Sequence, residues 1–89
     1  MSAQNIDVQA QAVKALPQIQ KGDSGDAVIL VQKLLRYLRF SVSVDGSFGD
    51  TTKGIVTEFQ RRNNLTSDGV VGTSTWHELI RQFNPPSVS

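Results

Sequence analysis

Three stretches of the chain carry apolar residues at helical spacing, and each stretch follows a pair of glycines. The apolar residues recur three or four positions apart, which places them on one face of an α-helix. They are Val28, Val31, Leu35 and Leu38, then Ile55, Val56 and Phe59, then Trp76, Leu79, Ile80 and Phe83. The pattern predicts an all-α fold, a compact three-helix bundle around one core. Further apolar residues are expected to thicken that core: Leu30, Leu34, Leu65 and Val71.

The glycine pairs indicate a repeated loop-plus-helix unit. Six of the seven glycines form three G-x-x-G turns, offset by 24 and then 23 residues: Gly22 and Gly25, Gly46 and Gly49, Gly69 and Gly72. The second and third units agree further, since residues 45–52 align with residues 68–75. The second glycine of each pair is predicted to lie at a helix N-cap.

Two local features of the helical region call for an explanation. Gly54 falls inside the second helix, where it costs about 1 kcal/mol relative to Ala, so close helix packing is the expected compensation. Phe40 to Val44 alternate apolar with polar residues, which predicts a brief extended segment too short for a sheet.

The ends of the chain differ from its middle. Ile6, Ala10, Val13 and Leu16 predict a short helix within residues 1–16 that ends before Pro17. Residues 84–89, which include Pro85 and Pro86, are predicted to form a tail or linker. The domain itself is therefore expected over residues 17–83.

Composition and charge narrow the range of ligands. The net charge of +1 is too small for a domain that neutralises several phosphates, so no nucleic-acid partner is expected. There is no Cys and a single His, and no metal or other cofactor is expected. The longest apolar run, Ala27 to Val31, is too short to span a membrane. Residues 1–16 do not resemble a signal peptide, so a cytoplasmic location stays open.

The candidate catalytic groups are better explained as structural groups. Asp45 and Asp68 could form a glycosidase pair of carboxylates, but they occupy equivalent repeat positions, which favours two Asx-type turns. His77 lies near Ser74, yet the local spacing gives no support for a nucleophile, a base and an orienting partner. The chain is therefore predicted not to be an enzyme.

The motifs from Leu16 to about Ile80 resemble those of the peptidoglycan-binding domains that accompany bacterial cell-wall hydrolases. The matching segments include D-G-S-F-G-D-T-T from Asp45, V-T-E-F-Q from Val56 and D-G-V-V-G-T-S-T-W from Asp68. The resemblance implies non-catalytic binding of a peptidoglycan glycan or stem peptide by a monomer. It also implies a linked or partner hydrolase, and a periplasmic, cell-wall or extracellular location. The alternative is a protein-docking or pro-segment-like module without glycan binding.

The sequence departs from the family pattern at two glycines, the one before an aromatic residue and the one in N-G-L. Arg39 stands at the first of these positions and would strain the backbone if the family geometry is kept, whereas Asn64, at the second, tolerates a left-handed conformation. Most matching residues are expected to be structural, with Gln32 and Gln60 bonded to loop backbone and Trp76 and Phe48 in the core. Candidate ligand residues are the polar groups near the loop edges and one aromatic: Arg39, Phe40, Ser47, Asn63 and Asn64.

Overall fold

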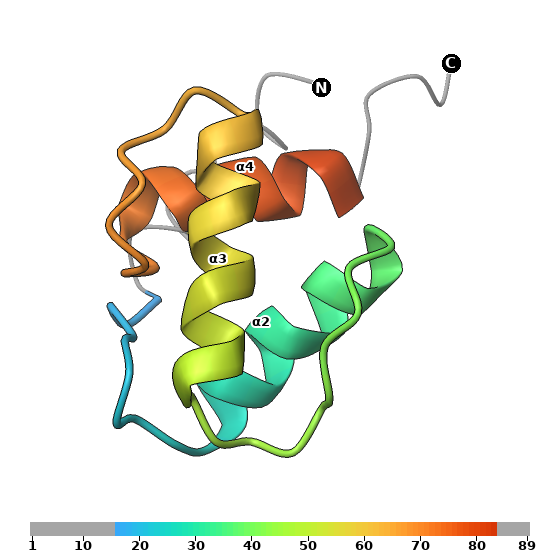
Figure 1. Cartoon of the computed structure of the whole chain (residues 1–89), viewed down its shortest axis with the longest axis vertical. Coiled ribbons are helices and arrows are strands. Elements are labelled where there is room, and N and C mark those ends of the chain that lie inside the picture. Colours follow the sequence, from blue (N-terminus) through green and yellow to red (C-terminus); the bar gives the residue numbers. More distant parts are fainter. Residues whose placement is uncertain (1–15, 84–89) are drawn as a thin grey trace, which may run out of the picture.

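The computed structural model describes residues 16–83, and these fold into three α-helices: α2, Asp26–Tyr37; α3, Asp50–Arg62; and α4, Thr73–Phe83 (Figure 1). Within that range the only β-type pairings are two isolated bridges, Ile19 with Val71 and Ser24 with Ser47. The predicted all-α class is confirmed. The tail expected at residues 84–89 lies outside the described residues, and so does the short N-terminal helix, apart from Leu16.

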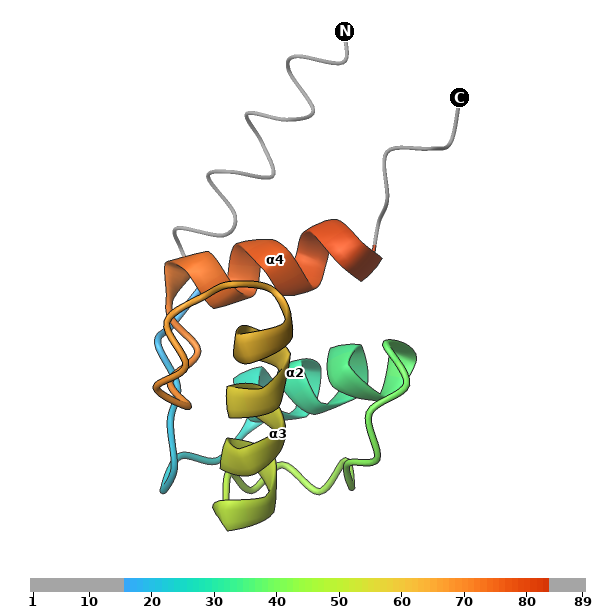
Figure 2. The same ribbon diagram turned by 45° about the horizontal axis from the view of Figure 1, so that its top comes forward.

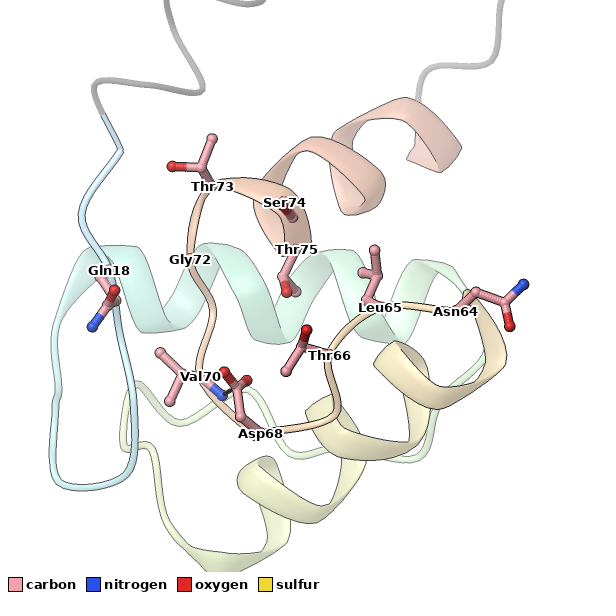
Figure 3. A pocket seen from close by; sticks show the side chains of 10 residues that line it. All are labelled: Gln18, Asn64, Leu65, Thr66, Asp68, Val70, Gly72, Thr73, Ser74 and Thr75. Carbon is pink, nitrogen blue, oxygen red and sulfur yellow. Dashed lines mark hydrogen bonds between the residues drawn. The ribbon is translucent and has the colours of Figure 1, made fainter.

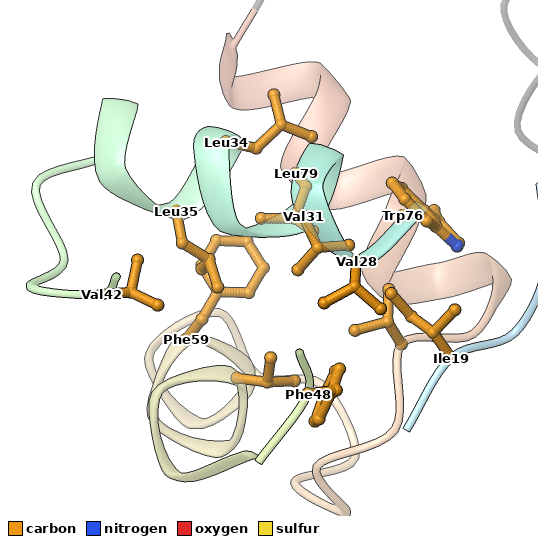
Figure 4. Packing of buried hydrophobic residues seen from close by; sticks show 12 residues of the cluster. Ile19, Val28, Val31, Leu34, Leu35, Val42, Phe48, Phe59, Trp76 and Leu79 are labelled. Atoms are coloured by element: carbon orange, nitrogen blue, oxygen red, sulfur yellow. The ribbon is translucent and has the colours of Figure 1, made fainter. Parts of the chain in front are cut away.

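The helices surround one core in which α2 and α4 pack against each other and α3 runs across α2 (Figures 1 and 2). Twelve buried hydrophobic residues form the cluster, and Figure 4 shows how side chains from all three helices and from the loops converge on it. Trp76 is fully buried, and its indole Nε1 donates a hydrogen bond to the carbonyl oxygen of Pro17 over 2.8 Å. The cluster comprises Ile19, Val28, Val31, Leu34, Leu35, Val42, Phe48, Val56, Phe59, Val71, Trp76 and Leu79.

Two residues expected in the core lie on the surface instead. Leu30 is 39% exposed and Phe83 is 47% exposed. Leu30 falls between the buried positions of α2, on the outer side of the helix. Phe83 is the last residue of α4, where its ring meets the exposed ring of Tyr37 edge-to-face at a centroid distance of 4.7 Å. Helical spacing alone does not show where the core stops along a helix.

The glycine turns start the helices as predicted. Gly25 and Gly49 are the N-caps of α2 and α3, and neither helix has a side-chain cap. Gly25 has a φ of 115°, a conformation that side chains with a Cβ rarely adopt. The backbone carbonyl of Gly72 accepts the first bond of α4, from the amide of Trp76 over 2.9 Å.

The ends of α2 and α3 share one motif, in which a left-handed residue reverses the chain. Arg39 follows α2 with a φ of 79°, and Asn64 follows α3 with a φ of 59°. The next residue then donates its amide back to the helix, Phe40 to Leu35 over 3.0 Å and Leu65 to Gln60 over 2.9 Å. This is the Schellman arrangement, for which glycine is the usual residue and Asn an accepted one. The backbone geometry expected at both departures is therefore kept.

The packing proposed for Gly54 is wrong. A Cβ added at this position would meet nothing within 4 Å, and the residue is exposed. Between the first two helices, residues 40–44 form no strand, and their alternation reflects burial instead, with Val42 buried and Ser41 and Ser43 exposed.

Candidate functional site

A fully buried glutamine organises the first Asp-Gly loop. The Gln32 amide nitrogen donates to the Asp45 carboxylate (3.1 Å), to the Ser47 carbonyl (3.0 Å) and to the Thr52 hydroxyl (3.2 Å). Its amide oxygen accepts from the backbone amides of Asp45 (3.1 Å) and Gly46 (2.9 Å). One side chain thus ties the loop to α2 and to the start of α3.

Gln60 does the same for the second Asp-Gly loop. Its amide nitrogen donates to the Asp68 carboxylate (3.2 Å), to the Val70 carbonyl (2.9 Å) and to the Thr75 hydroxyl (3.0 Å). Its amide oxygen accepts from the backbone amide of Gly69 over 2.9 Å. The repeat detected in the sequence is therefore a repeat of hydrogen bonding, and the expectation that both glutamines bond loop backbone is confirmed.

The two aspartates close the turns, as predicted. The Asp45 carboxylate accepts from the backbone amide of Ser47, and the Asp68 carboxylate accepts from that of Val70, each over 3.0 Å. The bond from Ser47, together with that from Gln32, lowers the pKa of Asp45 below its usual value. A carboxylate stabilised in its ionised form inside a turn is poorly suited to act as a general acid.

Each loop borders a hollow, and the two hollows are built from equivalent residues. The first has a volume of about 250 Å³ and the second, shown in Figure 3, about 460 Å³. A shift of 23 residues converts every lining residue of the first into one of the second. The first is lined by Val42, Ser43, Asp45, Ser47, Gly49, Asp50, Thr51 and Thr52, and the second by Leu65, Thr66, Asp68, Val70, Gly72, Thr73, Ser74 and Thr75, together with Gln18 and Asn64.

The two hollows differ in charge at their helix N-termini. Asp50 of the first hollow is paired with Lys21, whose ammonium lies 2.6 Å away and lowers the pKa of the carboxyl group. The equivalent position of the second hollow is Thr73, a neutral residue. The second hollow thus carries one carboxylate, Asp68, where the first carries two, and its other polar groups are hydroxyls and amides that suit a polar ligand.

Figure 3 shows how these groups are spread around the second hollow, with Gln18 and Val70 on one side and Asn64 on the other. The Thr75 hydroxyl is held by Gln60, whereas Thr66 and Ser74 are exposed. Of the sequence-predicted ligand residues, only Asn64 lines this hollow. Thr66 and Ser74 could have been predicted from the repeat, because the equivalent residues of the first unit, Ser43 and Thr51, also carry hydroxyl groups.

The other predicted ligand residues lie elsewhere. Ser47 borders the first hollow, while Arg39 and Phe40 border a third, which has a volume of about 750 Å³ at the end of α2. Phe40 packs edge-to-face on Phe59 at a centroid distance of 6.1 Å, and the guanidinium of Arg62 lies 5.2 Å from the Phe40 ring centre. The structure does not bring the five predicted residues into one site.

Asn63 has a structural role that the sequence did not reveal. Its side-chain amide donates to the Phe59 carbonyl over 2.8 Å, and its oxygen accepts from Gln82 of α4 over 2.7 Å. These two bonds tie the end of α3 to α4, so the Asn63 side chain supports the fold. Its role in ligand binding stays a prediction.

Two glutamates form ion pairs with arginines on the surface. Glu58 accepts hydrogen bonds from Arg61 and Arg62, which lower its pKa to about 2, and Arg81 likewise lowers the pKa of Glu78. Over residues 16–83, no three His, Cys, Asp or Glu side chains gather where they could hold a metal ion. No helix of that range has the length and apolar character needed to cross a membrane.

The sequence profile of the peptidoglycan binding domain family matches residues 24–79, which include both glutamine-held loops. The chain belongs to this family. It is 39% identical over 64 residues to a spore cortex-lytic enzyme of Bacillus cereus, covering 71% of this chain and 25% of that protein. The curated relatives are longer, since the chain covers between 24% and 58% of their lengths.

Solved structures agree with the assignment. The fold is similar to that of a peptidoglycan-binding protein from Clostridioides difficile in complex with glutamine hydroxamate, with a TM-score of 0.77, 38% identity and coverage of 79% of this chain and 44% of that one. It is also similar to the SleB N-terminal domain, with a TM-score of 0.73, 36% identity and coverage of 76% and 94%. This chain therefore covers almost the whole of the SleB N-terminal domain structure.

Proposed function

We propose that this domain binds peptidoglycan without chemical action on it and holds a linked or partner hydrolase against the cell wall. Membership of the peptidoglycan binding domain family carries the proposal. The similarity to a spore cortex-lytic enzyme supports a role beside a hydrolase. This function would place the domain in the periplasm, the cell wall or outside the cell.

The second hollow is the best candidate for the ligand site. Its rim offers hydroxyl groups of Thr66, Thr73 and Ser74 and the amides of Gln18 and Asn64. Glycans and stem peptides are rich in hydroxyl and amide groups, which such side chains recognise by hydrogen bonds. Because the buried Gln60 side chain fixes the loop by hydrogen bonds, the site is preorganised. The loop therefore loses little conformational freedom on binding.

The test is co-sedimentation of the 89-residue chain with purified peptidoglycan sacculi. We expect the wild-type chain in the pellet, no release of muropeptides, and reduced retention of the Ser74→Ala variant. The matched control is Thr51→Ala, which removes the equivalent hydroxyl from the first hollow and should bind like the wild type.

Each alternative outcome has a clear meaning. Wild-type protein left in the supernatant at low and moderate salt would contradict peptidoglycan binding and favour protein docking. Released muropeptides would contradict the non-catalytic role. Equal loss of binding in Ser74→Ala and Thr51→Ala would show that the second hollow is not the preferred site.

A further inference from the structure

The third hollow is a cationic site that the proposed function does not use. It lies where the chain leaves α2, and its lining consists of Arg36, Arg39, Phe40, Ser41, Val42 and Ser43. Val42 is buried in the core, while Phe40 is half-buried and packed on Phe59. The lining therefore combines an apolar residue, an aromatic ring and two arginines with two serines.

Arg36 and Arg39 lack the ion-pair partners that neutralise most of the other basic residues of the described range. Within residues 16–83, ion pairs engage Lys21, Arg61, Arg62 and Arg81, and no carboxylate of that range pairs with Arg36 or Arg39. Glu58, which bonds to the Arg62 guanidinium beside Phe40, is already shared by two arginines. The hollow thus carries unpaired positive charge.

Arg39 is held there at a cost in backbone energy. Its φ of 79° is one that glycine adopts freely and a residue with a Cβ does not. At the equivalent end of α3 the same hydrogen-bonded turn uses Asn64, which tolerates this conformation better. The Arg39 side chain is exposed, and among residues 16–83 it has neither a hydrogen bond nor an ion pair that would offset the strain.

A residue with a strained backbone whose side chain bonds to no other described residue points to a ligand that the side chain binds. A guanidinium binds a carboxylate through two parallel hydrogen bonds, and a second arginine three residues away strengthens the attraction. The hydroxyls of Ser41 and Ser43 and the ring of Phe40 suit the amide and methyl groups beside such a carboxylate. We infer that the hollow formed by Arg36, Arg39 and Phe40 binds the free carboxylate of a peptide, which in peptidoglycan is supplied by the stem peptide. The choice of peptidoglycan as the source rests on the proposed function.

The test uses two probes that differ only at the terminal group, N-acetyl-D-alanyl-D-alanine, which carries a carboxylate, and its neutral C-terminal amide. The full chain is titrated with each and followed by NMR chemical shifts. We expect the acid to shift the amide signals of residues 36–43 and to bind at least about tenfold more tightly than the amide, because a charge-assisted hydrogen bond is lost with the charge.

Variants locate the site. Arg39→Gly should weaken binding of the acid by about tenfold while the melting temperature stays equal or rises, because glycine removes the strain. Arg39→Asn repeats the test with asparagine, the residue found as Asn64 at the equivalent position after α3. Lys21→Gln is the control: it lowers the net charge by the same amount in the loop before α2, at a residue that pairs with Asp50 and does not line this hollow, and should leave binding unchanged.

Several results would overturn the inference. These are equal binding of the acid and the amide, unchanged binding by Arg39→Gly or Arg39→Asn, or an equal loss in Lys21→Gln. A chain that pellets with sacculi but binds neither probe would refute the carboxylate site and leave the proposed function intact. A chain that binds the acid but not sacculi would refute the proposed function and the peptidoglycan source while supporting the site.

Discussion

Two buried glutamines hold the loops of this domain more firmly than its surface charges do. Gln32 and Gln60 are each almost completely inaccessible, and both ends of each amide are hydrogen-bonded. No buried side-chain nitrogen or oxygen of the described residues lacks a partner. A buried amide with all its bonds made is favourable, whereas the loss of one partner leaves groups that water cannot reach.

The amide of Gln32 can be tested by replacement with a group of equal shape. Gln32→Glu places a carboxylate where the amide nitrogen now donates to Asp45. A carboxylate buried at position 32 would be desolvated and would be repelled by that of Asp45, so we expect a loss of more than about 2 kcal/mol of unfolding free energy at pH 7. The pKa of the new Glu would be raised in the folded state, so stability should recover as the pH falls and the group is protonated.

Thermal unfolding from pH 4 to pH 7 measures the effect of Gln32→Glu, with the exposed Gln20→Glu as control. An equal melting temperature for the two variants at pH 7 would show that the Gln32 amide does not hold the loop.

Trp76 joins the third helix to the segment before the first. Its ring is fully buried, and its Nε1 bonds to Pro17, 59 positions away in the sequence. We expect Trp76→Ala to lose roughly 3–5 kcal/mol of unfolding free energy, enough to unfold a small domain. Trp76→Phe should lose less, because it keeps an aromatic ring in the core. If Trp76→Ala melted like the wild type and lost only sacculus binding, Trp76 would be a ligand platform instead.

At the scale of the helices, the sequence predicted the elements better than their limits. Apolar spacing and glycine turns located all three helices, because the same signals set their buried faces and their N-termini. Phe83 is exposed because it lies at the end of α4, and Leu30 is exposed because it lies on the outer side of α2, off the stripe of Val28, Val31 and Leu35. The charged hollow at Arg39 was foreseen only in part, through the departure from glycine.

Gly54 offers a test of helix propensity free of packing. It lies inside α3, is exposed, and has open space where a Cβ would project. We expect Gly54→Ala to raise the unfolding free energy by about 0.5–1 kcal/mol, measured by chemical denaturation. Gly46→Ala is the contrast: its φ is 78° and the new Cβ would lie 3.2 Å from the Ile29 side chain, so that variant should be destabilised. A loss of stability in Gly54→Ala would reveal a constraint on that face of α3.

At the scale of the whole molecule, the duplicated loops account for both the fold and its two similar hollows. Each loop is tied to a preceding helix by a glutamine and to the following helix by a threonine. The repeat was visible in the sequence, but the hollows were not, because they arise from side chains that converge only after folding. Duplication provides two hollows lined by equivalent positions, and the exchange of Asp50 for Thr73 makes them chemically different.

Acid stability should report on how the carboxylates are held. The pKa is lowered at Asp45, Asp50, Glu58 and Glu78, so each group is more acidic in the folded than in the unfolded chain. Such groups stabilise the fold fully above their unfolded pKa of about 4, and the contribution is lost as the pH falls through the folded value. For Glu58 the loss extends down to a pH of about 2. The melting temperature should therefore be nearly level from pH 7 to pH 5 and decline below about pH 4.

Salt separates the two causes of these shifts. Glu58 is held by exposed arginines, whose attraction is screened by salt, whereas Asp45 is held first by the backbone amide of Ser47 and then by Gln32. We expect about 0.5 M NaCl to move the pKa of Glu58 back toward its ordinary value and to leave that of Asp45 nearly unchanged. NMR titration of the side-chain carboxyl carbons measures both in one sample. An Asp45 pKa that rises with salt as much as that of Glu58 would mean that general electrostatic attraction, and not the glutamine-held turn, keeps this carboxylate ionised.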